Sequence, residues 1–251
     1  MLEDMKPDTK FKPKPPPRSR VYAIGDVHGR LDLLDDLLAQ IAQDAQEAQT
    51  MDAPKRLVLV LLGDLIDRGP DSRGVLGRAV DLMNGKRLPD FEVHILKGNH
   101  EDALLRFLSG NDDGAQWLAN GGREAVASYG LKPRQAPEDL RQALLDALPK
   151  AQQRVLRDLK IKHVEGDYAF VHAGLRPGVA WDAQSQDDLM WIRREFTQSD
   201  ADFGYCVVHG HTPVDVPDVQ ANRIGIDTRA WASGILTSLV LEGKTRRFLH
   251  T

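Results

Sequence analysis

The chain of 251 residues is 41% hydrophobic and 28% charged, which is the composition of an ordinary globular protein. A net charge of −4 argues against bulk binding to nucleic acid or to a membrane surface, and no apolar run reaches the roughly 20 residues of a membrane span. Because Cys206 is the single cysteine, an intramolecular disulfide and an all-cysteine metal site are excluded, and we expect a cytoplasmic protein.

Residues 1–20 differ in composition from the rest of the chain. They contain five of the 14 prolines, and six basic residues stand against three acidic ones. Proline has no amide donor and a fixed φ, so this stretch predicts an extended or flexible leader. We expect residues 21–251 to form one domain.

From residue 21 onward the pattern alternates between strands and helices. Apolar runs predict strands at residues 21–24, 57–62 and 92–96, and the second run is apolar throughout, as in a strand that is covered on both faces. Helical spacing predicts helices at residues 31–47, 75–83, 101–129 and 137–158, of which the third is interrupted by glycine-rich turns and the last is split at Pro149.

After residue 160 the pattern changes to short strands joined by turns. We expect these strands at residues 161–164, 168–171, 205–208, 223–226, 236–241 and 246–249. The whole pattern predicts an α/β protein with two sheets in one compact unit and helices outside.

Several predicted strands end in loops that combine glycine with acidic, amide or imidazole side chains. The first three loops are GDVHG (25–29), GDLIDRG (63–69) and GNHE (98–101), and VHAG (171–174) and VHGHTP (208–213) follow later. Ligands of α/β sheets gather beyond the carboxyl ends of strands, so these loops can meet at one point. Asp and Asn oxygens with imidazole suit ions such as Mn, Fe, Zn or Co. Two ions about 3.5–4 Å apart can hold a hydroxide and a phosphoryl group, so the motifs predict a two-metal phosphoesterase.

The ordered motifs resemble the phosphoprotein phosphatase family of calcineurin-like metallophosphoesterases, and most closely its bacterial and bacteriophage serine/threonine phosphatase branch. The segments WLANGGREAVASYG (117–130) and IDTRAWASGILTSLVLEG (226–243) also resemble the bacterial members. The resemblance implies a four-layer α-β-β-α sandwich with two mixed sheets and a metal site at the carboxyl ends of the strands.

The resemblance also implies two divalent ions, with Mn expected and Fe, Zn, Co or Ni as alternatives. Asp64 would bridge the two ions. The implied ligands are Asp26, His28, Asp64, Asn99, His172 and His211.

The same resemblance assigns the catalytic side chains. His100 would protonate the leaving oxygen, and Asp67 would orient His100. Arg68, Arg193 and Asn99 would bind the substrate, the arginines through their planar forks. Arg194 adjoins Arg193 and stays open as an alternative second arginine.

Other residues near the motifs receive plainer interpretations. His209 is expected beside the site, and metal ligation by His209 stays open as the alternative to His211. Arg123 and Arg176 lie near motifs and could line the substrate entrance. His94, His163 and His250 match no motif and are expected to be ordinary strand or surface residues. Three tryptophans are expected to pack in the core and not to stack on the substrate: Trp117, Trp181 and Trp231.

Two functions compete for the same centre. The first is a serine/threonine protein phosphatase, with dual specificity as a variant, acting on a phosphoprotein or a small phosphorylated substrate. The second is a hydrolase of dinucleoside polyphosphates such as diadenosine tetraphosphate. The retained His28 and the Asp67-Arg68-Gly69 sequence favour the first, since relatives with the second activity tend to vary these positions. The oligomeric state is left open.

Overall fold

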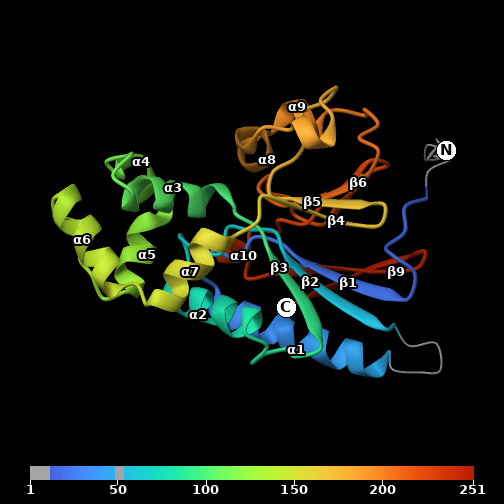
Figure 1. Ribbon diagram of the computed structural model, residues 1–251, viewed down its shortest axis with the longest axis horizontal. Coiled ribbons are helices and arrows are strands. Elements are labelled where there is room, and N and C mark those ends of the chain that lie inside the picture. The colour runs from blue at the N-terminus through green and yellow to red at the C-terminus, as the bar shows by residue number, and fades with distance from the viewer. Residues whose placement is uncertain (1–11, 49–53) are drawn as a thin grey trace.

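The computed structural model describes residues 12–48 and 54–251, and these residues form two five-stranded sheets (Figure 1). The strands are β1 (Ser19–Ile24), β2 (Arg56–Leu61), β3 (Phe91–Ile95), β4 (Lys162–Glu165), β5 (Tyr168–Val171), β6 (Cys206–His209), β7 (Asp218–Val219), β8 (Arg223–Gly225), β9 (Thr237–Glu242) and β10 (Thr245–His250). The first sheet has the order β10-β9-β1-β2-β3, and the second has the order β4-β5-β6-β8-β7.

Both sheets are mixed. In the first sheet β1, β2 and β3 are parallel, while β9 pairs antiparallel with β1 and β10. In the second sheet β5, β6 and β8 are parallel, while β4 and β7 pair antiparallel at the two edges. The parallel strands of each sheet end at a common edge, and the motif loops follow those ends.

Helices cover the outer faces and one end of the sheets (Figure 1). They are α1 (Leu31–Glu47), α2 (Ser72–Met83), α3 (Asn99–Leu108), α4 (Ala115–Trp117), the π-helical turn η1 (Leu118–Gly122), α5 (Arg123–Ser128), α6 (Pro137–Ala147), α7 (Lys150–Asp158), the 3-10 turn η2 (Trp181–Ala183), α8 (Gln186–Trp191), α9 (Arg194–Thr197) and α10 (Ala230–Ser233). Figure 1 shows α1 and α2 along the first sheet, α8 and α9 beyond the second, and α3 to α7 grouped at one end.

The strand sequences explain the layering. Val21 and Ala23 of β1 join the core between the two sheets, whereas Tyr22 and Ile24 face the core under the helices. This two-residue alternation is what a strand with both faces buried requires. A third apolar cluster, which includes Phe196, lies between the second sheet and α8–α9. The predicted four-layer sandwich with two mixed sheets is confirmed.

The N-terminal stretch departs from the predicted leader where it is described. Residues 1–11 lie outside the described residues, but β1 begins at Ser19, and Pro13 and Pro15 are buried. Lys14 exchanges two hydrogen bonds with Asp167, through its amide at 3.0 Å and its carbonyl at 2.9 Å. This proline-rich segment therefore packs along the second sheet, because proline rings can bury apolar surface without needing an amide partner.

The other predicted elements lie close to their expected positions. The split at Pro149 is confirmed, since α6 ends at Ala147 and Pro149 precedes the first residue of α7. The strand β7 and the short helices α8, α9 and α10 were not predicted, because they are too short to show a clear period. No helix in the described part of the chain is both long and apolar enough to cross a membrane.

Candidate metal centre

The loops that follow β1, β2 and β3 meet at Asp64. The Val27 and His28 amides donate to the Asp64 carbonyl oxygen at 3.1 and 2.8 Å, and the His100 amide donates to the Asp64 carboxylate at 3.1 Å. Gly98 leaves room for that carboxylate, since a Cβ atom there would lie 2.1 Å from Asp64 Oδ1. The carboxyl ends of the parallel strands thus bring the three loops together, as predicted.

The two carboxylate oxygens of Asp64 face two different groups of histidines. Oδ2 lies 3.5 Å from His28 Nε2 and 3.9 Å from His100 Nε2, while Oδ1 lies 3.4 Å from His172 Nε2. Potential ligand atoms of His28, Asp64 and His100 lie within 4.8 Å of one another, and so do those of Asp64, His172 and His211. Asp64 therefore occupies the place of a carboxylate that could contact two ions.

Strained backbone directs several of these side chains. His28, Asp64, Asp67, Arg68 and His211 have φ values between 46° and 73°. Residues other than glycine seldom adopt this left-handed conformation, which costs about 1–3 kcal/mol each and gathers at functional sites. The motif loops are thus held in a conformation that local preference alone would not select.

The imidazole rings present the atoms that bind metal. His28 Nδ1 donates to the Ile66 carbonyl and His172 Nδ1 donates to the Leu62 carbonyl, both at 2.9 Å. Metal-binding histidines commonly anchor their second nitrogen in this way, which turns Nε2 into the centre, although Arg68 Nη1 donates to that atom of His28 in this structure. The Nε2 atom of His211 is buried and has no hydrogen-bond partner, so a bound cation would satisfy it.

The protonation states of two of the three predicted histidine ligands, His28 and His211, suit metal binding, whereas His172 would have to lose its proton to an ion. Burial lowers the pKa of His28 to about 3 and the pKa of His211 to about 2, so both rings keep a free lone pair at neutral pH. Burial disfavours the charged form of His172 as well, but the charge of Asp64 outweighs it and raises the pKa of His172 to about 10. Carboxylates and imidazoles in one buried cluster fit divalent ions of the first transition series.

Asp26 and Asn99 complete the set of predicted ligands. Asp26 accepts the His211 backbone N–H at 3.1 Å, and Asn99 Oδ1 lies 2.9 Å from His172 Nε2. Burial and the nearby carboxylate of Asp227 raise the pKa of Asp26. Asp227, which the sequence analysis did not assign, is 3% exposed and adds to the negative charge of the centre. All the predicted ligands are buried together, and their individual ligation stays a prediction.

His209 lies apart from this centre. Its Nδ1 lies 3.1 Å from the Gly210 carbonyl, and its ring meets Phe196 edge-on at 5.0 Å between centroids. Among the described residues, His211 and not His209 belongs to a group that could hold an ion with Asp64 and His172. The geometry thus favours the predicted choice of His211.

Glu101 is a functional residue whose role the sequence analysis missed. Its Oε1 accepts the amides of Leu65 and Ile66 at 2.7 and 3.2 Å, and its Oε2 accepts those of Asp64 and Gly98, both at 2.9 Å. Burial and the charge of Asp64 raise the pKa of Glu101 to about 7. This buried carboxylate therefore joins the second motif loop to the third. The GNHE motif contains the signal, since its glutamate stands at the third helical position, where it can cap the helix.

His100 and Asp67 form a buried pair. His100 Nδ1 lies 2.7 Å from Asp67 Oδ2, and the Trp117 indole Nε1 donates to the same oxygen at 2.9 Å. Asp67 is fully buried and His100 is 3% exposed. The structure therefore brings together the predicted proton donor and its predicted orienting carboxylate.

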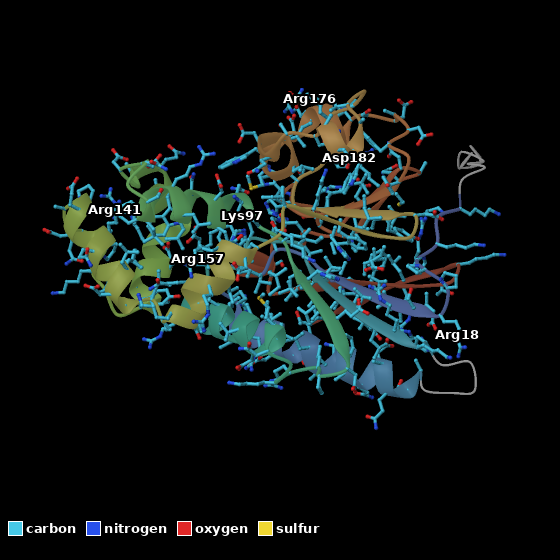
Figure 2. The ribbon with its side chains drawn as sticks, viewed as in Figure 1. Arg18, Lys97, Arg141, Arg157, Arg176 and Asp182 are labelled. Carbon is cyan, nitrogen blue, oxygen red and sulfur yellow. The ribbon has the colours of Figure 1, made fainter. Side chains whose placement is uncertain are left out.

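The predicted arginines lie at the rim. Arg68 Nη1 donates to His28 Nε2 at 2.8 Å, which places its guanidinium beside the centre. The charge of Arg193, which is exposed, helps to lower the pKa of His211, behind burial and the charge of His172, so the two side chains lie near each other. Arg123 lines a hollow with Arg68. Arg176 instead lies on the outer side of the α8–α9 layer, where Asp188 accepts its hydrogen bonds at 2.5 and 2.9 Å (Figure 2).

The tryptophans differ in their burial. Trp117 is 3% exposed and packs in the core as predicted, and Trp181 is half-buried against Tyr205. The prediction of core packing is wrong for Trp231, which is 44% exposed and whose ring lies 5.6 Å from the Arg68 guanidinium carbon. Trp231 lies outside the core because α10 carries it on the surface above a motif loop.

A groove of about 440 Å³ leads from His100 to the surface. Asn99, His100 and Trp117 lie at its inner end, and Trp191, which is 46% exposed, lies along it. The Trp191 ring centroid is 6.3 Å from that of His211. The groove therefore opens beside the predicted proton donor, His100, and beside one predicted metal ligand, Asn99.

A second histidine cluster lies away from the centre, where β3 and β4 approach each other. His94 and His163 stack with ring centroids 3.7 Å apart, and His163 Nε2 lies 2.8 Å from Glu165 Oε1. Lys160 donates to His94 at 2.9 Å, and Arg56 donates to Glu165 at 2.5 Å. Protein cations already occupy this cluster, so we interpret it as a structural link between the two sheets.

The two-sheet fold and the buried carboxylate–histidine centre define a metal-dependent phosphoesterase. The family model of the calcineurin-like phosphoesterases matches residues 19–231, and the chain belongs to this family.

The individual relatives share a third or less of their aligned residues with this chain. The chain is 25% identical over 224 residues to the asymmetrical bis(5'-nucleosyl)-tetraphosphatase PrpE of Oceanobacillus iheyensis, with 83% of each chain covered. It is 33% identical over 166 residues to the symmetrical bis(5'-nucleosyl)-tetraphosphatase of Aromatoleum aromaticum, with 65% of this chain and 46% of that protein covered. A solved protein serine/threonine phosphatase from Saccharomyces cerevisiae has a TM-score of 0.57 at 11% identity, with 94% and 84% covered. At that identity the last likeness concerns the fold alone.

Proposed function

We propose that the chain is a protein phosphatase of the serine/threonine type, which hydrolyses phosphoric monoesters of alcohols. The observation that carries this proposal is the buried His100–Asp67 pair at the inner end of the groove. An alkoxide leaves poorly unless it receives a proton, and a positioned imidazole can supply one. A polyphosphate leaving group is already stable as an anion and needs such a donor less.

The proposed roles follow the geometry. His100 gives its Nε2 proton to the leaving oxygen, and Asp67 holds the opposite nitrogen of that ring. Arg68 and Arg193 bind the phosphate oxygens through charge-assisted hydrogen bonds, and Asn99 contacts the substrate from the groove.

The proposed ligands are Asp26, His28, Asp64, Asn99, His172 and His211. When bound, two divalent ions, with Mn as the first choice, would activate the attacking water and polarise the phosphoryl group. Asp64 holds the position between the two histidine groups, and the amides bound to Glu101 fix its loop.

A dinucleoside polyphosphate is the second candidate substrate. The Oceanobacillus and Aromatoleum relatives, both of them bis(5'-nucleosyl)-tetraphosphatases, favour it. So do two exposed indoles at the site, Trp191 along the groove and Trp231 beside Arg68, on which nucleobases could stack. Replacing Trp231 by alanine should then weaken turnover of the dinucleotide and leave that of a phosphoserine peptide unchanged.

The two candidates are separated by comparing kcat/KM for a phosphoserine peptide, p-nitrophenyl phosphate and diadenosine tetraphosphate with Mn²⁺. We expect the peptide to be preferred over the dinucleotide. We also expect His100→Asn to lower kcat for the peptide by about 10²- to 10⁴-fold, the usual contribution of general acid catalysis. A preference for the dinucleotide by orders of magnitude would reverse the assignment, and full activity of both Asp64→Asn and His100→Asn would exclude the mechanism.

A further inference from the structure

We propose that Trp117 is a positioning residue that fixes the His100–Asp67 pair for proton donation. This inference rests on the proposed role of His100 as the proton donor. Trp117 belongs to α4 and is separated by 50 residues from Asp67, yet its indole Nε1 donates to Asp67 Oδ2 at 2.9 Å. The same oxygen faces His100 Nδ1 at 2.7 Å, so one atom connects the indole and the imidazole.

Asp67 needs such a partner because few other groups restrain its carboxylate. Its side chain is fully buried, and its Oδ1 atom has no hydrogen-bond partner. Its backbone has φ of 73°, which is a strained value for aspartate. A carboxylate that is bound at one oxygen only can rotate about its last torsion. The indole N–H donates to Oδ2 from a second direction, so the carboxylate cannot rotate freely. The imidazole that is bound to the same oxygen is thereby restrained too.

The indole itself packs closely against two neighbours, Phe107 and Gly122. It stacks on Phe107 with ring centroids 5.3 Å apart and an interplanar angle of 29°. A Cβ atom on Gly122 would lie 2.5 Å from the indole Cε2, so the backbone of the η1 turn approaches the ring too closely for any side chain larger than that of glycine. Phe107 and His100 both belong to α3, seven residues apart, and therefore lie on one face of that helix.

The backbone next to Asp67 is tied to the same segment. The Arg68 amide donates to the Gly121 carbonyl at 3.0 Å. The segment of residues 115–122 therefore holds the GDLIDRG loop at two adjacent residues, through a side chain at Asp67 and through the backbone at Arg68. A segment with two such contacts orients the predicted proton donor and also the predicted phosphate ligand.

The test is Trp117→Phe, which keeps an aromatic ring against Phe107 but removes the N–H donor. For a phosphoserine peptide we expect kcat to fall by about 10- to 100-fold, the range typical of losing an outer partner of a site residue. For p-nitrophenyl phosphate the loss should be much smaller, because its leaving group departs without a proton. Metal content should stay unchanged. The matched control is Trp181→Phe, which changes a tryptophan remote from the pair and should alter neither rate.

A merely structural role predicts a different result. It would lower both rates equally, and that outcome would overturn the inference. In a His100→Asn background, Trp117→Phe should cause no further loss on the peptide, since residues that act as one unit are not additive. Additive losses would overturn the inference too. If the wild-type chain hydrolyses neither ester, the proposed function is wrong. The contact of Trp117 with the His100–Asp67 pair can then still be tested by NMR.

NMR spectroscopy tests the same contact in protein that keeps Trp117, and so does not depend on whether Trp117→Phe folds. In protein labelled with ¹⁵N-tryptophan, the indole resonances can be assigned from single Phe variants of Trp181, Trp191 and Trp231. The resonance of Trp117 should move in His100→Asn, because both rings share one oxygen, while that of Trp181 stays in place. An unmoved Trp117 resonance would overturn the inference.

Discussion

Replacing Glu101 by glutamine isolates what one buried carboxylate contributes to the centre. Each Glu101 oxygen accepts two backbone amides, from Asp64 and Gly98 on one side and from Leu65 and Ile66 on the other. In Glu101→Gln, one oxygen becomes an NH₂ group, which cannot accept. Two buried N–H donors then lose their partner.

The expected loss is large. A buried donor left without a partner costs about 1–3 kcal/mol, so two of them should lower the free energy of unfolding by about 2–6 kcal/mol. A whole domain is typically stable by about 5–15 kcal/mol. Metal content should fall as well, because the loop that carries Asp64 loses its attachment to α3.

Urea unfolding near pH 8, above the raised pKa of Glu101, measures this loss with the carboxyl ionised. Glu138→Gln is the matched control, since Glu138 is exposed in the first turn of α6 and its charge there is worth about 0.3–1 kcal/mol. If Glu101→Gln is destabilised no more than this control, Glu101 does not join the two loops as we argue.

Three further predictions concern metal, backbone and pH. Dialysis against EDTA should abolish hydrolysis and lower Tm, Mn²⁺ should restore both, and His211→Ala should retain less metal by elemental analysis. Gly121→Ala should lower kcat/KM by up to about 100-fold with metal content unchanged, because φ is 112° there and a Cβ atom would lie 2.6 Å from Arg68 Cγ. Contacts with His163 and Arg56 outweigh burial and lower the pKa of Glu165 from 4.5 to about 2, so its stabilising effect is present above about pH 4.5 and is lost as pH falls toward 2. Glu165→Gln should therefore show a flatter loss of stability across that range.

Each of these has a result that contradicts it. Full activity after complete metal removal would refute the centre. An unchanged kcat/KM in Gly121→Ala would show that η1 does not position Arg68. Identical acid unfolding of Glu165→Gln and the wild-type chain would mean that the β3–β4 link contributes nothing to stability.

The local motifs determined where the predicted ligands lie. A glycine followed by a polar residue at the end of an apolar strand is a short-range pattern, and parallel strands carry their ends to one edge by the rules of sheet topology. Asp64 and His28 are therefore found in one cluster although they lie in different loops. The run at residues 57–62, apolar throughout, likewise predicted a strand covered on both faces, and the side chains of β2 alternate between two cores.

The tertiary structure decided the contacts between segments that no local pattern connects. Nothing in the spacing of Trp117 shows that its N–H reaches Asp67, because that contact depends on how α4 packs against Phe107. The burial of Pro13 and the exposure of Trp231 also differ from what their residue types had led us to expect. Residue type gives an average preference for burial, whereas the neighbours that cover a side chain are set by the packing of the whole chain. The sequence thus determined the chemistry of the centre, and the fold decided which distant residues orient it.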